Sequence, residues 1–168
     1  WSHWRWQLRH SFRGLDALER ILDLSDDERS AMQLSRNSLP NAITPYYASL
    51  LDRADPSQGL RRTMVMVKQE FVRTPEESID PLAEDADSPV PGLVHRYPDR
   101  VLFLTTGTCP VYCRYCTRSR VVGSNDGTYE FSTSQWERAI DYIARTPVIR
   151  DVLLSGGDPL ILSDDRLE

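Results

Sequence analysis

Apolar residues in the first part of the chain recur at helical spacing. Leu15, Leu18, Ile21 and Leu22 lie one, three or four residues apart, which is the pattern of one face of an amphipathic helix. The pattern predicts a helix that begins near Gly14 and stops before Leu24-Ser25.

Two further helix starts are indicated by capping residues. Ser25 and Glu28 have the spacing of a capping box, which predicts a second helix running to about Ser35. Thr44 followed by Pro45 has the form of an N-cap with proline at the first helical position, and it predicts a short helix reaching Leu51. The beginning of the chain is therefore expected to be mainly helical.

The middle of the chain is less regular. Residues 64–71 fit a helix or a strand equally well by period alone. Residues 74–92 carry several prolines and many carboxylates, which predicts an extended, solvated connection over the surface. We place the boundary at its end and expect a helical region over 1–92, connection included, and a second region over 93–168.

The pattern changes after this boundary. Val101–Leu104 and Val152–Leu154 are short apolar runs typical of buried strands. Between them, Ser134 and Glu137 suggest a capping box for a helix that Pro147 stops. This order predicts a β-α-β unit with parallel strands, a right-handed crossover and an α/β fold.

Composition narrows the class of protein. The chain has 168 residues, enough for an ordinary hydrophobic core, and a formal net charge of −5 with no long basic run. The charge argues against nucleic-acid binding, and no segment has the length of apolar sequence that a membrane span needs. We expect a soluble, cytoplasmic protein.

All three cysteines, Cys109, Cys113 and Cys116, fall within eight residues. Three thiolates in one loop can hold a soft metal centre and leave one coordination position without a protein ligand. A four-iron cluster held in this way keeps one iron available to bind a small molecule. The spacing therefore favours a cluster that takes part in chemistry.

Other uses of these thiols remain open at this point. Cys113 and Cys116 could form a zinc knuckle completed by Cys109 and by His3, His10 or His95, which would make the chain a structural metal-binding module. Zinc knuckles more often come as two separated pairs. A disulfide framework is disfavoured by the odd number of cysteines.

A glycine turn follows the second apolar run. Ser155, Gly156, Gly157 and Asp158 stand directly after Val152–Leu154, much as the cysteines follow Val101–Leu104. In isolation such a turn is only a turn. Because the carboxyl ends of parallel strands meet at one edge of a sheet, the turn and the thiols are expected to share that edge. There the glycines would let backbone approach a ligand, and Asp158 could accept a hydrogen bond from an ammonium group.

These motifs resemble those of the radical S-adenosylmethionine (SAM) enzymes. The cysteine spacing, with aromatic Tyr115 before the last cysteine, is similar to their cluster signature, and Ser155–Asp158 resembles their second, cofactor-contacting element. More narrowly, the chain resembles the lysine 2,3-aminomutase family. The segments that carry this likeness are Trp4–Gln7, Ala42–Tyr47, His95–Arg100, Tyr112–Arg114, Cys116–Arg118 and Asp151–Asp158.

The resemblance implies a fold and a set of ligands. It implies the start of a partial (β/α) barrel after the helical region, and a 4Fe-4S cluster on the three cysteines, fed by a reductant. Family positions near S-adenosylmethionine are matched by Tyr115, Ser155, Gly156, Gly157 and Asp158. Positions near pyridoxal 5′-phosphate are matched by Arg96, Tyr97 and Arg100. Arg118 matches the arginine that pairs with the substrate carboxylate.

The implied reaction moves an α-amino group to the β carbon through a 5′-deoxyadenosyl radical, most simply L-lysine to L-β-lysine. Glutamate or another amino acid is an alternative substrate, and a relative that modifies a lysine for a translation factor is another alternative. Two departures bear on this choice: Tyr115 stands where the lysine enzymes usually have histidine, and Ser119 interrupts an arginine triplet. The whole protein is expected to form a homo-oligomer.

Lys68 is the sole lysine of the chain. Pyridoxal phosphate is normally attached to a lysine, and Lys68 lies far from any position that matches this role. We therefore expect the chain to be a fragment whose attachment lysine and remaining barrel lie elsewhere, and which does not turn over substrate alone.

Overall fold

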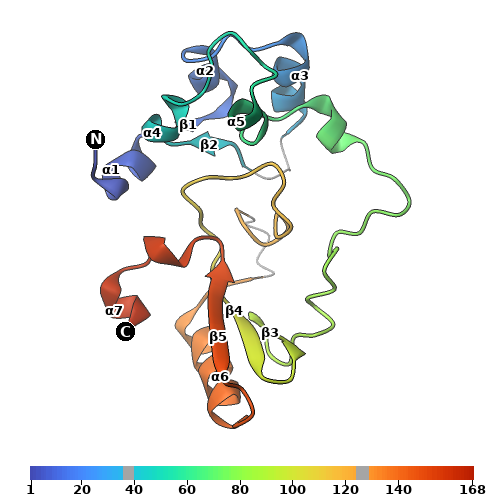
Figure 1. Ribbon diagram of the computed structural model, residues 1–168, viewed down its shortest axis with the longest axis vertical. Coiled ribbons are helices and arrows are strands. Elements are labelled where there is room, and N and C mark those ends of the chain that lie inside the picture. The colour runs from blue at the N-terminus through green and yellow to red at the C-terminus, as the bar shows by residue number, and fades with distance from the viewer. Residues whose placement is uncertain (36–39, 124–128) are drawn as a thin grey trace. The chain divides into compact units, whose positions relative to one another are not determined.

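The computed structural model describes residues 1–35, 40–123 and 129–168 (Figure 1). It divides into two compact units. Unit 1 comprises residues 1–77 and 110–116, and unit 2 comprises residues 78–109 and 117–168. The boundary thus passes through the cysteine loop, between Cys109 and Pro110.

Unit 1 consists of short helices and a two-stranded antiparallel ribbon. The predicted helix starts in unit 1 are confirmed: one helix begins at Gly14, Ser25 and Glu28 form the expected capping box, and Thr44 accepts a hydrogen bond from the Tyr47 amide. The elements are α1 (Trp4–Arg9), β1 (Phe12–Arg13), α2 (Gly14–Glu19), α3 (Asp26–Leu34), β2 (Ala42–Ile43), α4 (Pro45–Ala48), α5 (Gly59–Arg62) and the 3-10 helix η1 (Lys68–Phe71).

Residues 64–71 adopt neither of the two regular structures that their period allowed. Met64, Val65 and Met66 are buried in the core of unit 1, and only Lys68–Phe71 forms a turn of 3-10 helix. All three residues of the apolar run are buried regardless of which side they project from. This is why no helical or strand period stands out in the sequence.

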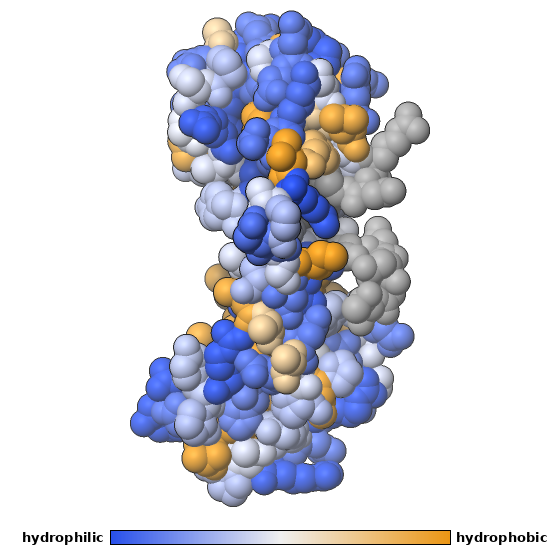
Figure 2. All heavy atoms as spheres, turned by 90° about the vertical axis from the view of Figure 1, so that its right-hand side faces the viewer, coloured by the Kyte–Doolittle hydropathy of each residue, from blue (hydrophilic) through white to orange (hydrophobic). Residues whose placement is uncertain are grey.

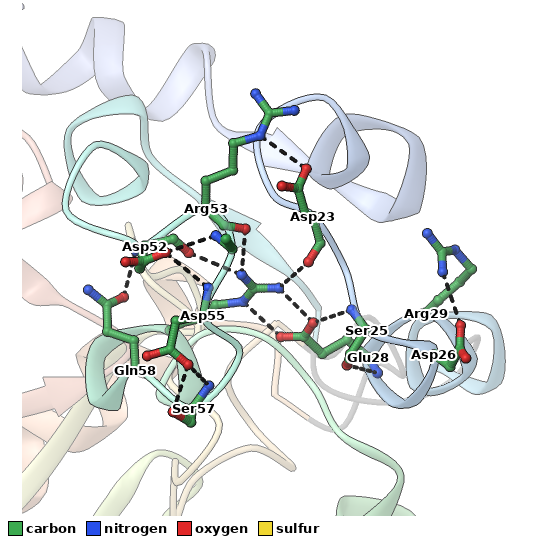
Figure 3. A network of polar contacts seen from close by, with 12 residues as sticks. Asp23, Ser25, Asp26, Glu28, Arg29, Asp52, Arg53, Asp55, Ser57 and Gln58 are labelled. Atoms are coloured by element: carbon green, nitrogen blue, oxygen red, sulfur yellow. Dashed lines mark hydrogen bonds and ion pairs between the residues drawn. The ribbon is translucent and has the colours of Figure 1, made fainter.

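Arg61 joins the helices of unit 1 through one fully buried guanidinium. Its side chain is 0% exposed and pairs with Glu28, Nε donating to Oε1 at 2.9 Å and Nη2 to Oε2 at 2.7 Å. The remaining hydrogen bonds go to the main-chain carbonyls of Asp23, Asp52 and Arg53 at 2.8–3.0 Å (Figure 3). A buried guanidinium is tolerated because its donors are satisfied in this way.

Unit 2 is built on a three-stranded sheet of order β3-β4-β5, in which β3 is antiparallel and β5 parallel to β4. The predicted β-α-β unit is confirmed as β4-α6-β5, with Val101 opposite Val152 and Phe103 opposite Leu154. The elements are β3 (Leu93–Tyr97), β4 (Arg100–Thr106), α6 (Thr133–Ala144), β5 (Asp151–Gly156), the 3-10 helix η2 (Pro159–Ile161) and α7 (Asp164–Leu167).

The core of unit 2 lies between α6 and the sheet. Ala139 of α6 is buried together with Leu93, Val101 and Phe103 of the strands, and Trp136 meets Phe103 edge to face. The prediction of a buried strand is correct for β4. It is wrong for β5, where Val152, Leu153 and Leu154 are 41%, 51% and 47% exposed. β5 lies at one edge of the sheet, where only β4 is its neighbour among the described strands.

The predicted cap of α6 is also wrong. The helix begins two residues earlier than expected, with Ser132 as N-cap accepting a hydrogen bond from the Gln135 amide. The Gln135 side chain accepts a hydrogen bond from the Phe131 amide at 3.0 Å. Both Ser132 and Ser134 could have served as the N-cap. The contact between Phe131 and Gln135, which lies at the start of the helix, accompanies the cap at Ser132.

The surface drawn in Figure 2 is mostly hydrophilic, with hydrophobic residues scattered among polar ones. No helix within the described ranges has the length and apolar character required to cross a membrane.

Candidate functional site

The loops that follow β4 and β5 are bonded to each other. Gly157 donates its amide hydrogen to the Thr106 carbonyl at 2.6 Å, and Asp158 donates to the Thr108 carbonyl at 2.9 Å. Thr105 adds a side-chain bond to the Ser155 carbonyl at 3.2 Å. The glycine turn therefore lies against the residues that lead directly into Cys109, at the expected edge of the sheet.

The structure gives the two glycines a role within the chain. Gly156 has φ +106°, and a Cβ there would lie 2.4 Å from the Thr106 carbonyl oxygen. A Cβ on Gly157 would lie 2.1 Å from the Thr108 carbonyl oxygen. Real Cβ atoms do not come this close to backbone, so only glycine lets the two loops meet. The sequence suggested close approach to a ligand; the close approach seen here is to the start of the cysteine loop.

Asp158 uses its carboxylate locally. Its Oδ1 accepts a hydrogen bond from the Leu160 amide at 3.0 Å and caps η2. The carboxylate remains partly exposed, and its other lone pairs can accept from a ligand.

Cys109, Cys113 and Cys116 are partly buried thiols. Cys109 belongs to unit 2, whereas Cys113 and Cys116 belong to unit 1, where the Cys116 amide donates to the Cys113 carbonyl in a turn. Within the described residues, no three His, Cys, Asp or Glu side chains form a group that could hold a metal ion. The fit to an iron–sulfur cluster therefore rests on the donor set, because three thiolates are the ligands such clusters take.

Arg114 anchors the cysteine loop within unit 1. Its amide donates to the Thr63 carbonyl at 2.9 Å, and its guanidinium pairs with Glu70 through Nη2 at 2.6 Å. The neighbouring Tyr115 is 71% exposed. A hydrogen bond with Cys113 is the main cause that raises the pKa of Tyr115 above its ordinary value.

The arginines expected to bind anions each pair with a carboxylate of unit 2. Arg96 pairs with Asp87 at 2.6 Å and also donates to the Leu82 carbonyl. Arg100 pairs with Asp99 at 2.9 Å, and its guanidinium carbon lies 6.0 Å from the centre of the exposed Tyr97 ring. These side chains are at the surface, so the pairs are weak and leave the arginines available to a ligand.

Arg118 and Arg120 pair with the acidic connection at less exposed positions. Arg118 donates to Glu84 at 2.6 Å, and Arg120 pairs with Asp80 at 3.3 Å and Asp85 at 3.0 Å. The predicted solvated connection is thus wrong at Glu84, although most of its neighbours are exposed. Glu84 is only 5% exposed, because arginines supplied by the segment after the cysteines neutralise it.

Two groups of this network, Asp80 and Tyr129, have pKa values that differ from their ordinary ones. Burial alone would raise the pKa of Asp80, but the amide hydrogens of Asp85 and Glu84 and the guanidinium of Arg120 outweigh it and lower that pKa. Burial is the main cause that raises the pKa of Tyr129, with a hydrogen bond to Asp85 acting in the same direction.

Glu84 is the residue of this site that sequence reasoning missed. It stands in a run of acidic residues that all look alike in the sequence, and most of them are exposed. The one feature of the sequence that could have pointed to Glu84 is that it directly follows the apolar residues Leu82 and Ala83. This feature is too weak to distinguish Glu84 from the other acidic residues.

Comparison with known proteins shows what the chain is similar to. Residues 103–167 match the profile of the Radical SAM superfamily. Over 100% of its length the chain is 48% identical to L-lysine 2,3-aminomutase of Bacillus subtilis and 46% identical to that of Acetoanaerobium sticklandii. The chain is therefore similar over its whole length to lysine 2,3-aminomutases, and residues 103–167 are similar to the Radical SAM superfamily. The resemblance seen in the sequence motifs is confirmed.

The chain is also similar to an aminomutase that is named for a different substrate. Glutamate 2,3-aminomutase of Clostridioides difficile is 34% identical over 100% of the chain. The chain spans 40%, 35% and 39% of the length of the Acetoanaerobium, Bacillus and Clostridioides proteins.

The zinc alternative loses support within this family. His95 Nδ1 lies 2.8 Å from the Tyr142 hydroxyl, and His10 stacks on Trp6 with its Nδ1 bonded to the Trp6 carbonyl. One ring nitrogen of each of these two histidines thus has a protein partner.

Proposed function

We propose that the protein containing this chain is a radical SAM amino-acid 2,3-aminomutase that converts L-lysine to L-β-lysine. The observation that carries the proposal is the 46–48% identity to lysine 2,3-aminomutases over the whole chain. The 34% identity to a glutamate 2,3-aminomutase makes glutamate the second candidate substrate.

The cofactors follow from the family and from the donor chemistry. Cys109, Cys113 and Cys116 hold a 4Fe-4S cluster through their thiolates. Ser155–Asp158 and Tyr115 contact S-adenosylmethionine, whose methionyl end carries a carboxylate and an ammonium group, and Asp158 accepts a hydrogen bond from that ammonium group. The bound cluster with S-adenosylmethionine supplies a 5′-deoxyadenosyl radical, and pyridoxal phosphate supplies the group that carries the migrating amine.

The arginines serve the anionic parts of the ligands. Arg96 and Arg100, with Tyr97, bind the phosphate of pyridoxal 5′-phosphate, since a guanidinium can offer two parallel donors to a phosphate. Arg118 binds the substrate carboxylate. Their surface carboxylate partners are exchangeable at Arg96 and Arg100, because exposed ion pairs contribute little free energy.

The architecture that we propose for the whole protein is a partial (β/α) barrel that begins with β4-α6-β5. The exposed apolar side chains of edge strand β5 support continuation of the sheet on that side. In this proposal residues 1–92 form a helical region with its acidic connection, and residues 93–168 begin the barrel. The protein acts in the reducing cytoplasm with a reductant for the cluster, as a homo-oligomer and without nucleic acid.

Anaerobic reconstitution of the full-length protein with iron and sulfide tests the cluster. We expect a brown protein whose absorption and electron paramagnetic resonance spectra change when S-adenosylmethionine is added. Cys113→Ser should abolish the colour, while Ser119→Ala should keep it. A colourless protein with one zinc per chain would refute the proposal.

Product analysis tests the substrate. With pyridoxal phosphate and a reductant present, we expect β-lysine from L-lysine and little product from L-glutamate. If the protein instead converted L-glutamate in preference to L-lysine, glutamate would be its substrate. The 168-residue chain alone should give no product, because its sole lysine, Lys68, lies on η1 of unit 1; turnover by the chain alone would contradict this.

A further inference from the structure

Glu84 makes a largely buried ion pair with Arg118 in unit 2. Its Oε1 accepts a hydrogen bond from Arg118 Nη2 at 2.6 Å, and the two side chains are 6% and 22% exposed. Arg120 Nη2 lies 3.9 Å from Glu84 Oε2. A carboxylate this deeply buried must stay paired, because releasing it unpaired into the interior is costly.

The turn that carries Glu84 is tied at several points. Ala83 has φ +50°, an uncommon conformation for alanine, and its amide donates to the Asp80 carbonyl at 3.1 Å. The Asp80 carboxylate accepts from the Asp85 amide at 2.9 Å, and the Glu84 carbonyl accepts from the Ser88 hydroxyl at 2.7 Å. Glu84 is therefore presented from a fixed turn.

Arg118 is equally constrained on its main-chain side. Its carbonyl accepts from the amides of Val121 and Val122 at 2.9 Å and 2.8 Å, and these two valines are 1% and 2% exposed. Its Nε, however, is buried and has no hydrogen-bond partner within the described parts of the chain. A buried donor without a partner costs about 1–3 kcal/mol, so a ligand oxygen that reached this N–H would remove that cost.

We propose that Glu84 is the positioning residue for Arg118 in substrate recognition. It holds one terminal nitrogen of the guanidinium and leaves Nε–H for a carboxylate oxygen of the amino-acid substrate. The inference rests on the proposed function, since it takes the ligand of Arg118 to be that carboxylate. Glu84 itself does not touch the substrate.

The fixed turn favours positioning of Arg118 over the alternative that Glu84 competes with the substrate carboxylate for Arg118. A carboxylate that merely occupied Arg118 until substrate arrived would need to move away, and the bonds of Asp80 and Ser88 hold the main chain of its turn in place. Glu84 also stays close to Arg120 when Arg118 takes a second anion. Its charge lowers the affinity of Arg118 for anions in general, while the orientation that it imposes favours an oxygen placed at Nε.

Equilibrium binding to the full-length, cofactor-loaded protein tests the proposal. The probes are L-lysine and its decarboxylated diamine, measured by calorimetry for Glu84→Ala, for Glu84→Gln and for the control Glu76→Gln, whose side chain is exposed. We expect Glu84→Ala to weaken L-lysine binding by about tenfold or more and diamine binding by less than about twofold. Glu84→Gln keeps an acceptor oxygen and should stay within about threefold of the original protein, as should Glu76→Gln.

Tighter L-lysine binding by both Glu84 variants would overturn the proposal in favour of competition. Equal weakening of lysine and diamine by Glu84→Ala would overturn it in favour of a merely structural role, as would unchanged binding of both. If the original protein binds no L-lysine, the proposed substrate fails, and the carboxylate probe becomes L-glutamate, compared with its own decarboxylated amine.

A second readout does not depend on any substrate. In nuclear magnetic resonance spectra with ¹⁵N-labelled arginine, the Arg118 Nε–H should give a resolved, slowly exchanging signal that broadens or exchanges at least about tenfold faster in Glu84→Ala. Glu84→Gln should restore it. An Arg118 signal that is the same in all three proteins would refute positioning by Glu84.

Discussion

At the scale of single residues, steric fit at the glycine turn decides whether the loops that follow β4 and β5 can meet. Gly156 and Gly157 pass so close to the carbonyls of Thr106 and Thr108 that no side chain fits. The turn thereby transmits the position of β5 to the residues that precede Cys109.

The matched substitutions Gly157→Ala and Gly59→Ala test this fit. A Cβ on Gly157 would lie 2.1 Å from a backbone oxygen, whereas one on Gly59 would meet nothing within 4 Å. We expect Gly157→Ala to lower the free energy of unfolding by about 2–3 kcal/mol through overpacking. Gly59→Ala should leave it unchanged or raise it slightly. Denaturant unfolding followed by circular dichroism measures both, and equal stabilities would show that the loops adjust.

Arg61 provides the second residue-scale prediction. Lysine in its place keeps one charge but loses the forked donors that satisfy Glu28 and three carbonyls. Arg61→Lys should therefore destabilise the protein by about 2–4 kcal/mol. The control Arg53→Lys alters an exposed pair with Asp23 and should change stability by less than about 0.5 kcal/mol. Thermal and denaturant unfolding of the two variants measure these changes in stability. Similar small losses of stability in both variants would contradict the role assigned to Arg61.

At the scale of elements, the start of α6 is set by Ser132. Its hydroxyl accepts a hydrogen bond from the Gln135 amide, while the Ser134 hydroxyl lies 3.1 Å from that of Ser132. Ser132→Ala should cost about 1 kcal/mol as the loss of an N-cap, and Ser134→Ala less than about 0.5 kcal/mol. Unfolding midpoints of the two variants measure the difference. A larger effect at Ser134 would restore the cap expected from the sequence.

The acidic connection contributes a pH-dependent part of the stability. The folded-state pKa of Asp80 lies below its ordinary value of 3.8 because amide hydrogens and Arg120 outweigh the effect of burial. Its contribution is therefore complete above the unfolded pKa and is lost as the pH falls through the folded value.

Asp80→Asn tests this contribution. The variant should be less stable than the original protein by a constant amount above about pH 5, and the gap should shrink below about pH 4. Urea unfolding between pH 3 and pH 7 measures the gap. The exposed control Glu77→Gln should show little change at any pH, and a gap that is unchanged at pH 3 would show that Asp80 is not paired in the folded state.

At the scale of the whole molecule, the described residues form two hydrophobic cores, and β5 is an edge strand with exposed apolar side chains. The first core gathers helices of unit 1 around Leu18, Ile43 and Met66, and the second joins α6 to the sheet of unit 2. The cysteine loop is the segment in which the chain passes from unit 2 to unit 1 and back.

The edge strand predicts how the isolated chain behaves. Leu153 of β5 is 51% exposed on a strand with an open side, a combination that promotes pairing with another chain. Leu153→Lys should reduce self-association of the chain, whereas Ile140→Lys on α6, where the side chain is also exposed, should reduce it less. Sedimentation velocity at several concentrations measures the effect, and equal behaviour would show that the edge is not the site of association.

The sequence by itself determined the local features and the chemistry. Capping at Ser25 and Thr44, the β4-α6-β5 order and the spacing of the three cysteines all follow from residues close together in the chain, because their physical causes act over one or two turns. The resemblance to lysine 2,3-aminomutases could also be read from such short motifs.

Only the tertiary structure decided which residues are buried and what they pair with. The sequence does not distinguish Glu84 from the acidic residues around it, or β5 from a buried strand, since both depend on segments distant in the chain. The same holds for Gly156 and Gly157. Their glycine character is visible in the sequence, but the carbonyls that require it come from the loop after β4, which a separate strand brings alongside.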